Sequence, residues 1–140
     1  MNVLDKFLND SLLLESKCGE FGDYYIYVNS DDSGNIPHFH MKDTNTDGKK
    51  FHTCIQLTKN NYFLHEGKTK VISSSKIRKE LCKLLKSKPT KIPKEIQHIK
   101  PLPKTVWEMM CYLWNTSYRS QYINLKTTKI PDYTIIHPER

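Results

Sequence analysis

The sequence predicts an α+β fold: a four-stranded antiparallel meander packed by an N-terminal helix and two longer C-terminal helices. Short runs of alternating apolar and polar residues, separated by polar turns, fill residues 24–66, and this pattern is typical of antiparallel strands with short connections. Two segments with helical spacing of apolar residues follow between residues 74 and 118. A chain of 140 residues that is 37% hydrophobic and 26% charged fits one globular domain.

The N-terminal helix is expected within residues 1–20. Its apolar residues recur three and four positions apart, beginning with Val3, Leu4, Phe7 and Leu8. The segment from Cys18 to Asp23 contains two glycines and breaks this pattern, so we expect a turn there.

Four strands are expected, at residues 24–29, 37–42, 51–57 and 62–65. Aromatic and β-branched residues dominate the first of them. The second begins at Pro37, where a missing N–H does no harm. Its alternation places His38, His40 and Lys42 on one face and two apolar residues on the other, which predicts a half-buried strand.

Two helices joined by a proline-rich linker are expected after the sheet. A serine at position 73, 74 or 75 can cap the first helix, which should end before Lys88-Pro89 because the residue preceding a proline avoids the helical region. Residues 87–104 contain four prolines and should be extended and surface-lying. Thr105 can cap the second helix, which should run to about Ser117, with Trp107 and Trp114 in the core. Residues 119–140 are expected to be an extended tail that wraps the domain.

Positive charge is concentrated in one segment of the chain. Residues 67–104 have a net charge of +10, whereas residues 1–66 have −4 and residues 105–140 have +1. Such a segment favours a polyanionic partner, RNA or DNA or a nucleoprotein complex, and the alternative is a solvated lysine-rich face. The candidate binding residues are Lys76, Arg78, Lys79, Lys83, Lys86, Lys88, Lys91 and Lys94. The segment itself contains no aromatic residue, so rings for base stacking would come from Tyr25, Tyr27 and Tyr62.

The histidines of the second predicted strand are the candidate catalytic or metal-binding residues. If the hairpin brings His52 across from His40, the imidazoles of His38, His40 and His52 meet on one surface, whereas a slip of one residue separates them. Three imidazoles can bind zinc or a similar ion, and His38 and His40 can also act as general acid and base. Structural or partner-contacting histidines are the third possibility. The sequence predicts no other cofactor.

Several other patterns are set aside. The stretch from Asp43 to Gly48 matches the first half of an EF-hand calcium loop, but Cys54 stands where the bidentate Glu is needed, so we interpret it as a hairpin turn. Four widely spaced cysteines, Cys18, Cys54, Cys82 and Cys111, are expected to be free and buried in a reducing compartment. With no signal peptide and no apolar run of membrane-spanning length, a cytoplasmic location is expected.

The strand from Tyr24 to Val28, a polar turn and then Pro37-His38-Phe39-His40 resemble a family of small bacterial and phage proteins, domain of unknown function 4160. Its signature is Pro-Pro-His-Phe-His at the start of a strand, and Ile36 replaces the first proline here. Later segments, including Ile130-Pro131-Asp132-Tyr133, resemble a variant found in Bacteroidetes and their phages. The resemblance implies an accessory protein of mobile elements or of defence and counter-defence loci.

The function expected from these observations is that of a small basic, non-enzymatic binding protein. It would engage RNA or DNA, or a nucleic-acid-handling protein complex, as an anti-CRISPR-like counter-defence factor. The alternative is a small histidine-dependent nuclease or metal-binding enzyme that uses His38 and His40.

Overall fold

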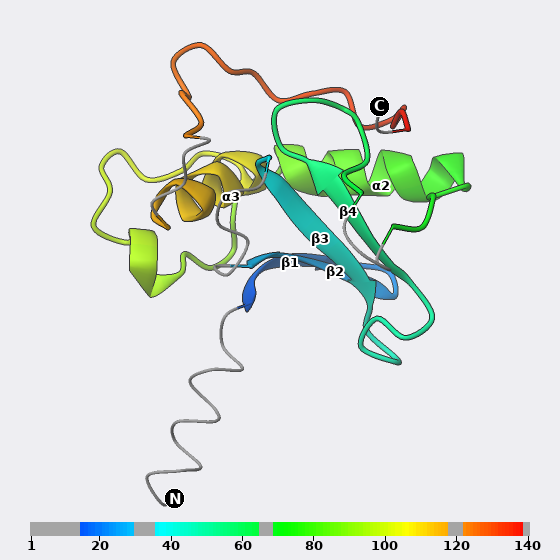
Figure 1. Ribbon diagram of the computed structural model, residues 1–140. Coiled ribbons are helices and arrows are strands. Elements are labelled where there is room, and N and C mark those ends of the chain that lie inside the picture. Colours follow the sequence, from blue (N-terminus) through cyan, green and yellow to red (C-terminus); the bar gives the residue numbers. More distant parts are fainter. Residues whose placement is uncertain (1–14, 30–35, 65–68, 118–121, 139–140) are drawn as a thin grey trace, which may run out of the picture.

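The α+β class is confirmed by a computed structural model, which describes residues 15–29, 36–64, 69–117 and 122–138. The elements, in chain order, are β1 (Glu15–Phe21), β2 (Tyr24–Asn29), β3 (His38–Asp43), β4 (His52–Gln56), α2 (Ser75–Lys86), a short 3₁₀ helix η1 (Lys94–Ile96) and α3 (Val106–Asn115). The strands form one antiparallel sheet in the order β1-β2-β3-β4, with α2 and α3 above it in Figure 1.

The chain from residue 15 to residue 21 is a strand, so the expected helix is wrong for residues 15–20, and its first 14 residues lie outside the described part. β1 pairs with β2 through a bulge between Lys17 and Gly19, and the tight turn that follows contains Gly22 at φ +53°. The glycine at position 19 misled the prediction. Gly19 lies inside the strand, where a Cβ atom would lie 3.1 Å from the Leu84 methyl carbons. Because glycine has no Cβ atom, α2 can pack closely against β1 at this point.

The expected fourth strand at residues 62–65 is also wrong. Of its described residues, Tyr62 makes an isolated bridge to Ile55, and the preceding residue, Asn61, makes another to His137. β1 therefore supplies the fourth strand of the sheet, at the edge opposite β4. At the β4 edge Tyr62 bridges to Ile55, and His137 of the tail bridges in turn to Asn61.

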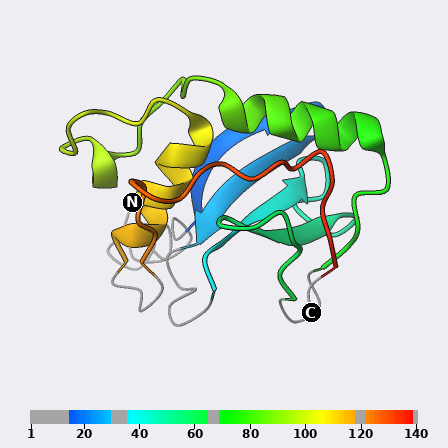
Figure 2. The same cartoon turned by 90° about the horizontal axis from the view of Figure 1, so that it is seen from above.

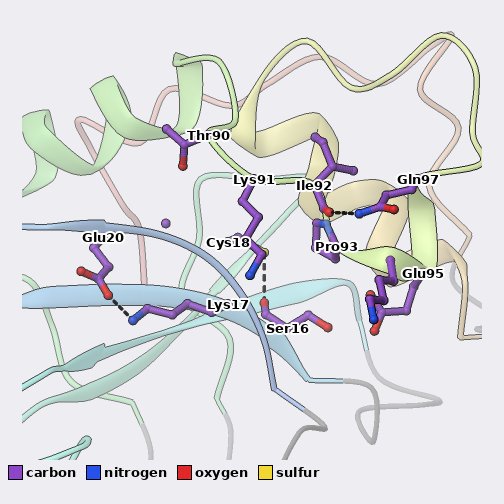
Figure 3. Close-up of a pocket in the computed structure, with 12 residues that line it drawn as sticks. Ser16, Lys17, Cys18, Glu20, Thr90, Lys91, Ile92, Pro93, Glu95 and Gln97 are labelled. Carbon is purple, nitrogen blue, oxygen red and sulfur yellow. Dashed lines mark hydrogen bonds and ion pairs between the residues drawn. The ribbon is translucent and has the colours of Figure 1, made fainter.

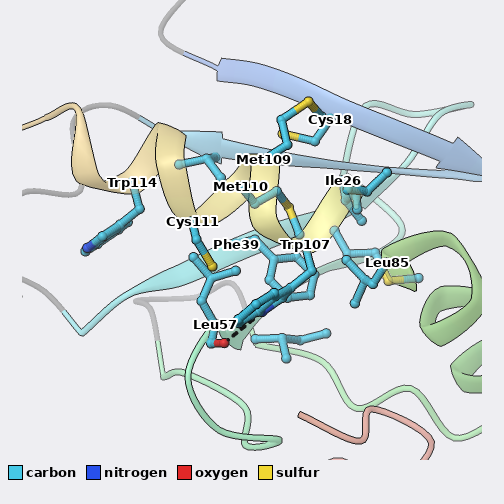
Figure 4. Packing of buried hydrophobic residues seen from close by; sticks show 14 of the residues in the cluster. Cys18, Ile26, Phe39, Leu57, Leu85, Trp107, Met109, Met110, Cys111 and Trp114 are labelled. Atoms are coloured by element: carbon cyan, nitrogen blue, oxygen red, sulfur yellow. Dashed lines mark hydrogen bonds between the residues drawn. The ribbon is translucent and has the colours of Figure 1, made fainter. Parts of the chain in front are cut away.

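The main core lies between the helices and one face of the sheet (Figure 4). Ile26, Phe39 and Ile55 line this face and are fully buried. They pack in one cluster with Leu81, Leu85 and the residues of α3. The indole N–H of Trp107 donates to the carbonyl of Leu57 at 3.0 Å, which anchors α3 just beyond the end of β4.

Both helices begin at the caps that the sequence predicts. The Ser74 hydroxyl accepts the amide of Ile77 at 3.2 Å, and the Thr105 hydroxyl accepts that of Glu108 at 3.1 Å. The intervening linker is not simply extended over the surface, because it contains η1 and buries Ile96 in the core. No helix in the described part of the chain is long and apolar enough to cross a membrane.

The described part of the tail, residues 122–138, packs against the body and runs alongside α2 when the molecule is seen from above (Figure 2). The buried Tyr133 hydroxyl donates to the carbonyl of Gln56 at 2.6 Å. The Arg78 guanidinium donates from α2 to the carbonyls of Thr134 and Ile72. These contacts join the tail to both layers of the fold.

Candidate functional site

The predicted histidines lie on one face of the sheet, the face opposite the helix-packed core. In the β3–β4 hairpin, His40 pairs with Cys54 and Lys42 pairs with His52. Because paired residues share a face and side chains alternate along a strand, His38, His40, His52 and Cys54 all project to the same side. The three imidazoles therefore meet, as one of the two possible registers predicts.

The side chains of this cluster are within contact distance. His40 Nδ1 lies 2.9 Å from His52 Nε2 and 3.3 Å from Cys54 Sγ. His38 Nδ1 lies 2.8 Å from the carbonyl oxygen of Ile36, and this contact requires that Nδ1 carries the proton. One ligand atom each from His38, His40 and Cys54 lies within 4.8 Å of the other two.

The expectation of a half-buried strand is wrong, because His38 and His40 have no exposed surface. Aromatic rings cover them: Tyr27 stacks on His40 with centroids 4.7 Å apart, and Phe63 stacks on His38 at 4.2 Å. Trp114 of α3 lies 5.5 Å from the His38 ring. A nucleic-acid phosphate cannot reach imidazoles buried in this way without displacing those rings, which argues against phosphodiester cleavage here.

Cys54 belongs to this cluster, but the sequence analysis did not single it out. It is fully buried, as His38 and His40 are. The sequence does contain a signal for this position, because the alternation of side chains along residues 51–57 places Cys54 on the same face as His52. Without a known hairpin register, that pattern could not show which histidine faces the thiol.

The lysines of α2 form an exposed face. Lys76, Lys79, Lys83 and Lys86 are exposed, and at 100° per residue they fall within a sector of about 80°. We call these four residues the α2 lysine face. It is turned away from the buried side of the helix, which carries Leu81 and Leu85. Lys17 and Glu20 form an ion pair elsewhere in the described part of the chain, and the charged group near this face is Asp132, whose carboxyl feels the charge of Lys86.

Arg78 differs from the lysines in its role. It is half-buried, and its guanidinium donates to two backbone carbonyls rather than facing solvent. Arg78 belongs to the binding set that the sequence predicted, but it holds the tail, and two of the N–H groups of its guanidinium donate to the protein's own backbone.

The aromatic residues expected to stack on bases are not accessible. Tyr25, Tyr27 and Tyr62 have exposed fractions of 9% or less. The hydroxyl of Tyr62 accepts the amide of Ile72 at 2.7 Å, while the ring packs in the core. The prediction that these three rings complete a nucleic-acid surface is wrong, because all three residues are buried.

A cleft of about 720 Å³ lies between β1 and the linker (Figure 3). Lys91 extends into it from the linker toward Cys18, and Lys94 lines it as well. Burial raises the pKa of the Cys18 thiol to about 12, so this thiol stays protonated and is a poor nucleophile. The cleft is therefore lined by two lysines of the linker, Lys91 and Lys94, and its Cys18 thiol is not reactive.

The carboxylates of Asp43 and Asp47, at the β3–β4 loop, accept hydrogen bonds from other groups of the protein. Asp43 accepts the amides of Thr46, Gly48 and Phe51 and the hydroxyl of Thr46. Asp47, with φ +50°, accepts the Tyr25 hydroxyl at 2.6 Å. This is the hydrogen bonding of a tight hairpin turn, in agreement with the interpretation of the sequence.

Comparison of the chain with protein-family models, with curated proteins and with solved structures finds no match.

Proposed function

We propose that the protein binds the phosphate backbone of a nucleic acid through the α2 lysine face. The observation that carries this proposal is the position of Lys76, Lys79, Lys83 and Lys86 in one exposed sector of a single helix. Ammonium groups placed along a rigid helix match the regular negative charge of a nucleic-acid strand, and counterion release on binding supplies the free energy.

The linker extends this positive surface. Lys88, Lys91 and Lys94 follow the helix directly and are exposed. Because the tyrosines of the sheet are buried, the contact is expected to be with phosphates and sugars rather than with bases. Binding should then depend weakly on base sequence and strongly on salt.

The histidine-dependent nuclease is the weaker alternative. Its proposed acid and base, His38 and His40, are buried under aromatic rings, whereas the α2 lysine face is open to solvent. A counter-defence role rests on the resemblance to the mobile-element family and would require a nucleoprotein target that presents negatively charged phosphates to the α2 lysine face.

The test is a titration of labelled RNA and of a DNA duplex of equal length at low salt. The double variant Lys79→Glu/Lys83→Glu should weaken binding by about tenfold or more, because it replaces two attractive phosphate contacts with two repulsive ones. These two lysines occupy the middle of the face. They avoid Lys86, because hydrogen bonds from Thr134 and then the charge of Lys86 lower the pKa of the Asp132 carboxyl.

The matched control is Lys49→Glu/Lys50→Glu, which changes the net charge equally. Both control lysines are exposed in the β3–β4 loop, far from α2 in Figure 1. Equal losses of affinity in the two double variants would attribute binding to net charge and overturn the proposed surface. Absence of any shift with micromolar wild-type protein at low salt would overturn nucleic-acid binding itself.

A further inference from the structure

We propose that His38, His40 and Cys54 form a buried binding site for a transition-metal ion of the zinc type. This inference is independent of the α2 lysine face, because the cluster lies on the opposite face of the sheet from the helix-packed core. It also changes the ligand set that the sequence analysis considered, since a thiolate takes the place of the third imidazole.

The cluster has the dimensions of a metal site. The three ligand atoms lie within 4.8 Å of one another. Tetrahedral zinc, with bonds of about 2.0–2.3 Å, needs ligand atoms about 3.3–3.6 Å apart. Cys54 Sγ and His40 Nδ1 are already 3.3 Å apart, so rotamer-scale movement within the hairpin suffices to complete the set.

The hydrogen bonding of His38 selects the ligand atom. Because Nδ1 donates to the carbonyl of Ile36 at 2.8 Å, the neutral ring carries its lone pair on Nε2. A metal-bound histidine typically donates its other N–H to a carbonyl or carboxylate, which fixes the ring and its tautomer. The contact to Ile36 is of this kind.

His52 is the nearest candidate for a fourth ligand. Its Nε2 lies 2.9 Å from His40 Nδ1, and the residue is half-buried, so it lies toward solvent from the fully buried cluster. One thiolate and two or three imidazoles favour zinc over calcium or magnesium, which prefer oxygen ligands.

Binding releases a proton. The Cys54 S–H bond breaks, the sulfur lone pair bonds to the metal, and the proton leaves to solvent. Because protons compete with the metal for the ligands, the affinity for the metal should fall as the pH is lowered. The bound ion would join β3 to β4 beneath the aromatic rings, and its burial gives it a role in stability.

The experiment titrates the full chain, after treatment with a chelator, with Co²⁺ as a spectroscopic substitute for Zn²⁺. We expect uptake of one ion per chain, intense visible bands of tetrahedral cobalt and a thiolate-to-cobalt charge-transfer band in the near ultraviolet. Added Zn²⁺ should displace the cobalt and remove these bands. A spectrum of hydrated cobalt alone would overturn the site without any variant.

Two sets of variants assign the ligands. Cys54→Ser should abolish the charge-transfer band, whereas Cys18→Ser, Cys82→Ser and Cys111→Ser, each made singly at the other buried thiols, should retain it. His38→Gln or His40→Gln should weaken metal binding by about tenfold or more, while the exposed His98, changed to Gln, should have no effect.

If Cys54→Ser fails to fold, the other three cysteine variants still assign the thiolate by elimination. Loss of the band in any of them would overturn the assignment to Cys54. Full retention of cobalt affinity in folded His38→Gln and His40→Gln would leave the cluster as a hydrogen-bonded core without a metal, and would refute the proposal.

Discussion

At the scale of single residues, Asp43 organises the β3–β4 hairpin. Hydrogen bonds from the Thr46 hydroxyl and from the amides of Thr46, Phe51 and Gly48 lower the pKa of the Asp43 carboxyl to about 2. Three of these donors are backbone amides that the loop would otherwise leave without a strand partner. The charged carboxylate therefore stabilises the folded loop relative to the unfolded chain.

The variant Asp43→Asn should be less stable than the wild type at neutral pH, because the amide accepts these bonds more weakly than a carboxylate does. The folded pKa is lower than the unfolded value of 3.8, so the contribution of the charge is present above that value and disappears as the pH falls toward about 2. Denaturant unfolding across this range should show the two proteins converging.

The control for this variant is Asp23→Asn, which removes the same charge at an exposed position in the β1–β2 turn. It separates the effect of net charge from that of the loop hydrogen bonds. A stability difference for Asp43→Asn that stays constant down to about pH 2 would contradict the assignment, since the charge would then not be its cause.

At the scale of elements, Tyr133 fastens the tail to the end of β4. Tyr133 is fully buried, and its hydroxyl donates to the Gln56 carbonyl at 2.6 Å. Tyr133→Phe should keep the edge-to-face ring contact with Phe39 but leave that buried carbonyl without this donor. We expect the free energy of unfolding to fall by about 1–2 kcal/mol, measured by urea denaturation.

The exposed Tyr122, in the same tail, provides the matched control. Tyr122→Phe removes a hydroxyl that solvent can replace, so the stability should change by less than about 0.5 kcal/mol. Equal effects of the two substitutions would mean that the bond to Gln56 does not fasten the tail to the sheet.

The strands at β2, β3 and β4 and both helices follow from local signals: alternation, serine and threonine caps, and Pro89. β1 was missed because a bulge disrupts its alternation and Gly19 mimics a turn signal, while its actual role is close packing against Leu84. Residues 62–65 have strand composition, but among the described residues only Tyr62 bridges to β4, and the preceding Asn61 bridges to His137 of the tail.

For the candidate site, the sequence predicted the shared face but not its burial. Whether a polar strand face is exposed depends on what packs over it, and Phe63 and Trp114 come from other parts of the chain. The sequence likewise could not show that Tyr27 is buried. Its ring was expected to stack on nucleic-acid bases, but it stacks on His40 instead. Only the exposure of the α2 lysines follows from a local pattern, the helical period of the leucines opposite them.

At the scale of the whole molecule, the uneven charge along the sequence becomes an uneven charge in space. The segment 67–104, with net charge +10, includes α2 and the linker. The four positions of the α2 lysine face span about 15 Å along the helix axis. A polyanion that follows this axis and continues along the linker would meet Lys88, Lys91 and Lys94 next.

The salt dependence of binding measures how much of this surface is used. Four phosphate contacts predict a slope of log K against log salt of about −3.6 for duplex DNA and about −2.8 for a single strand, and seven contacts predict about −6 for the duplex. Changing all four residues of the α2 lysine face to Ala should therefore reduce the duplex slope by about three to four units. A smaller affinity with an unchanged slope would show that these lysines do not contact phosphate, because only lost counterion release changes the slope.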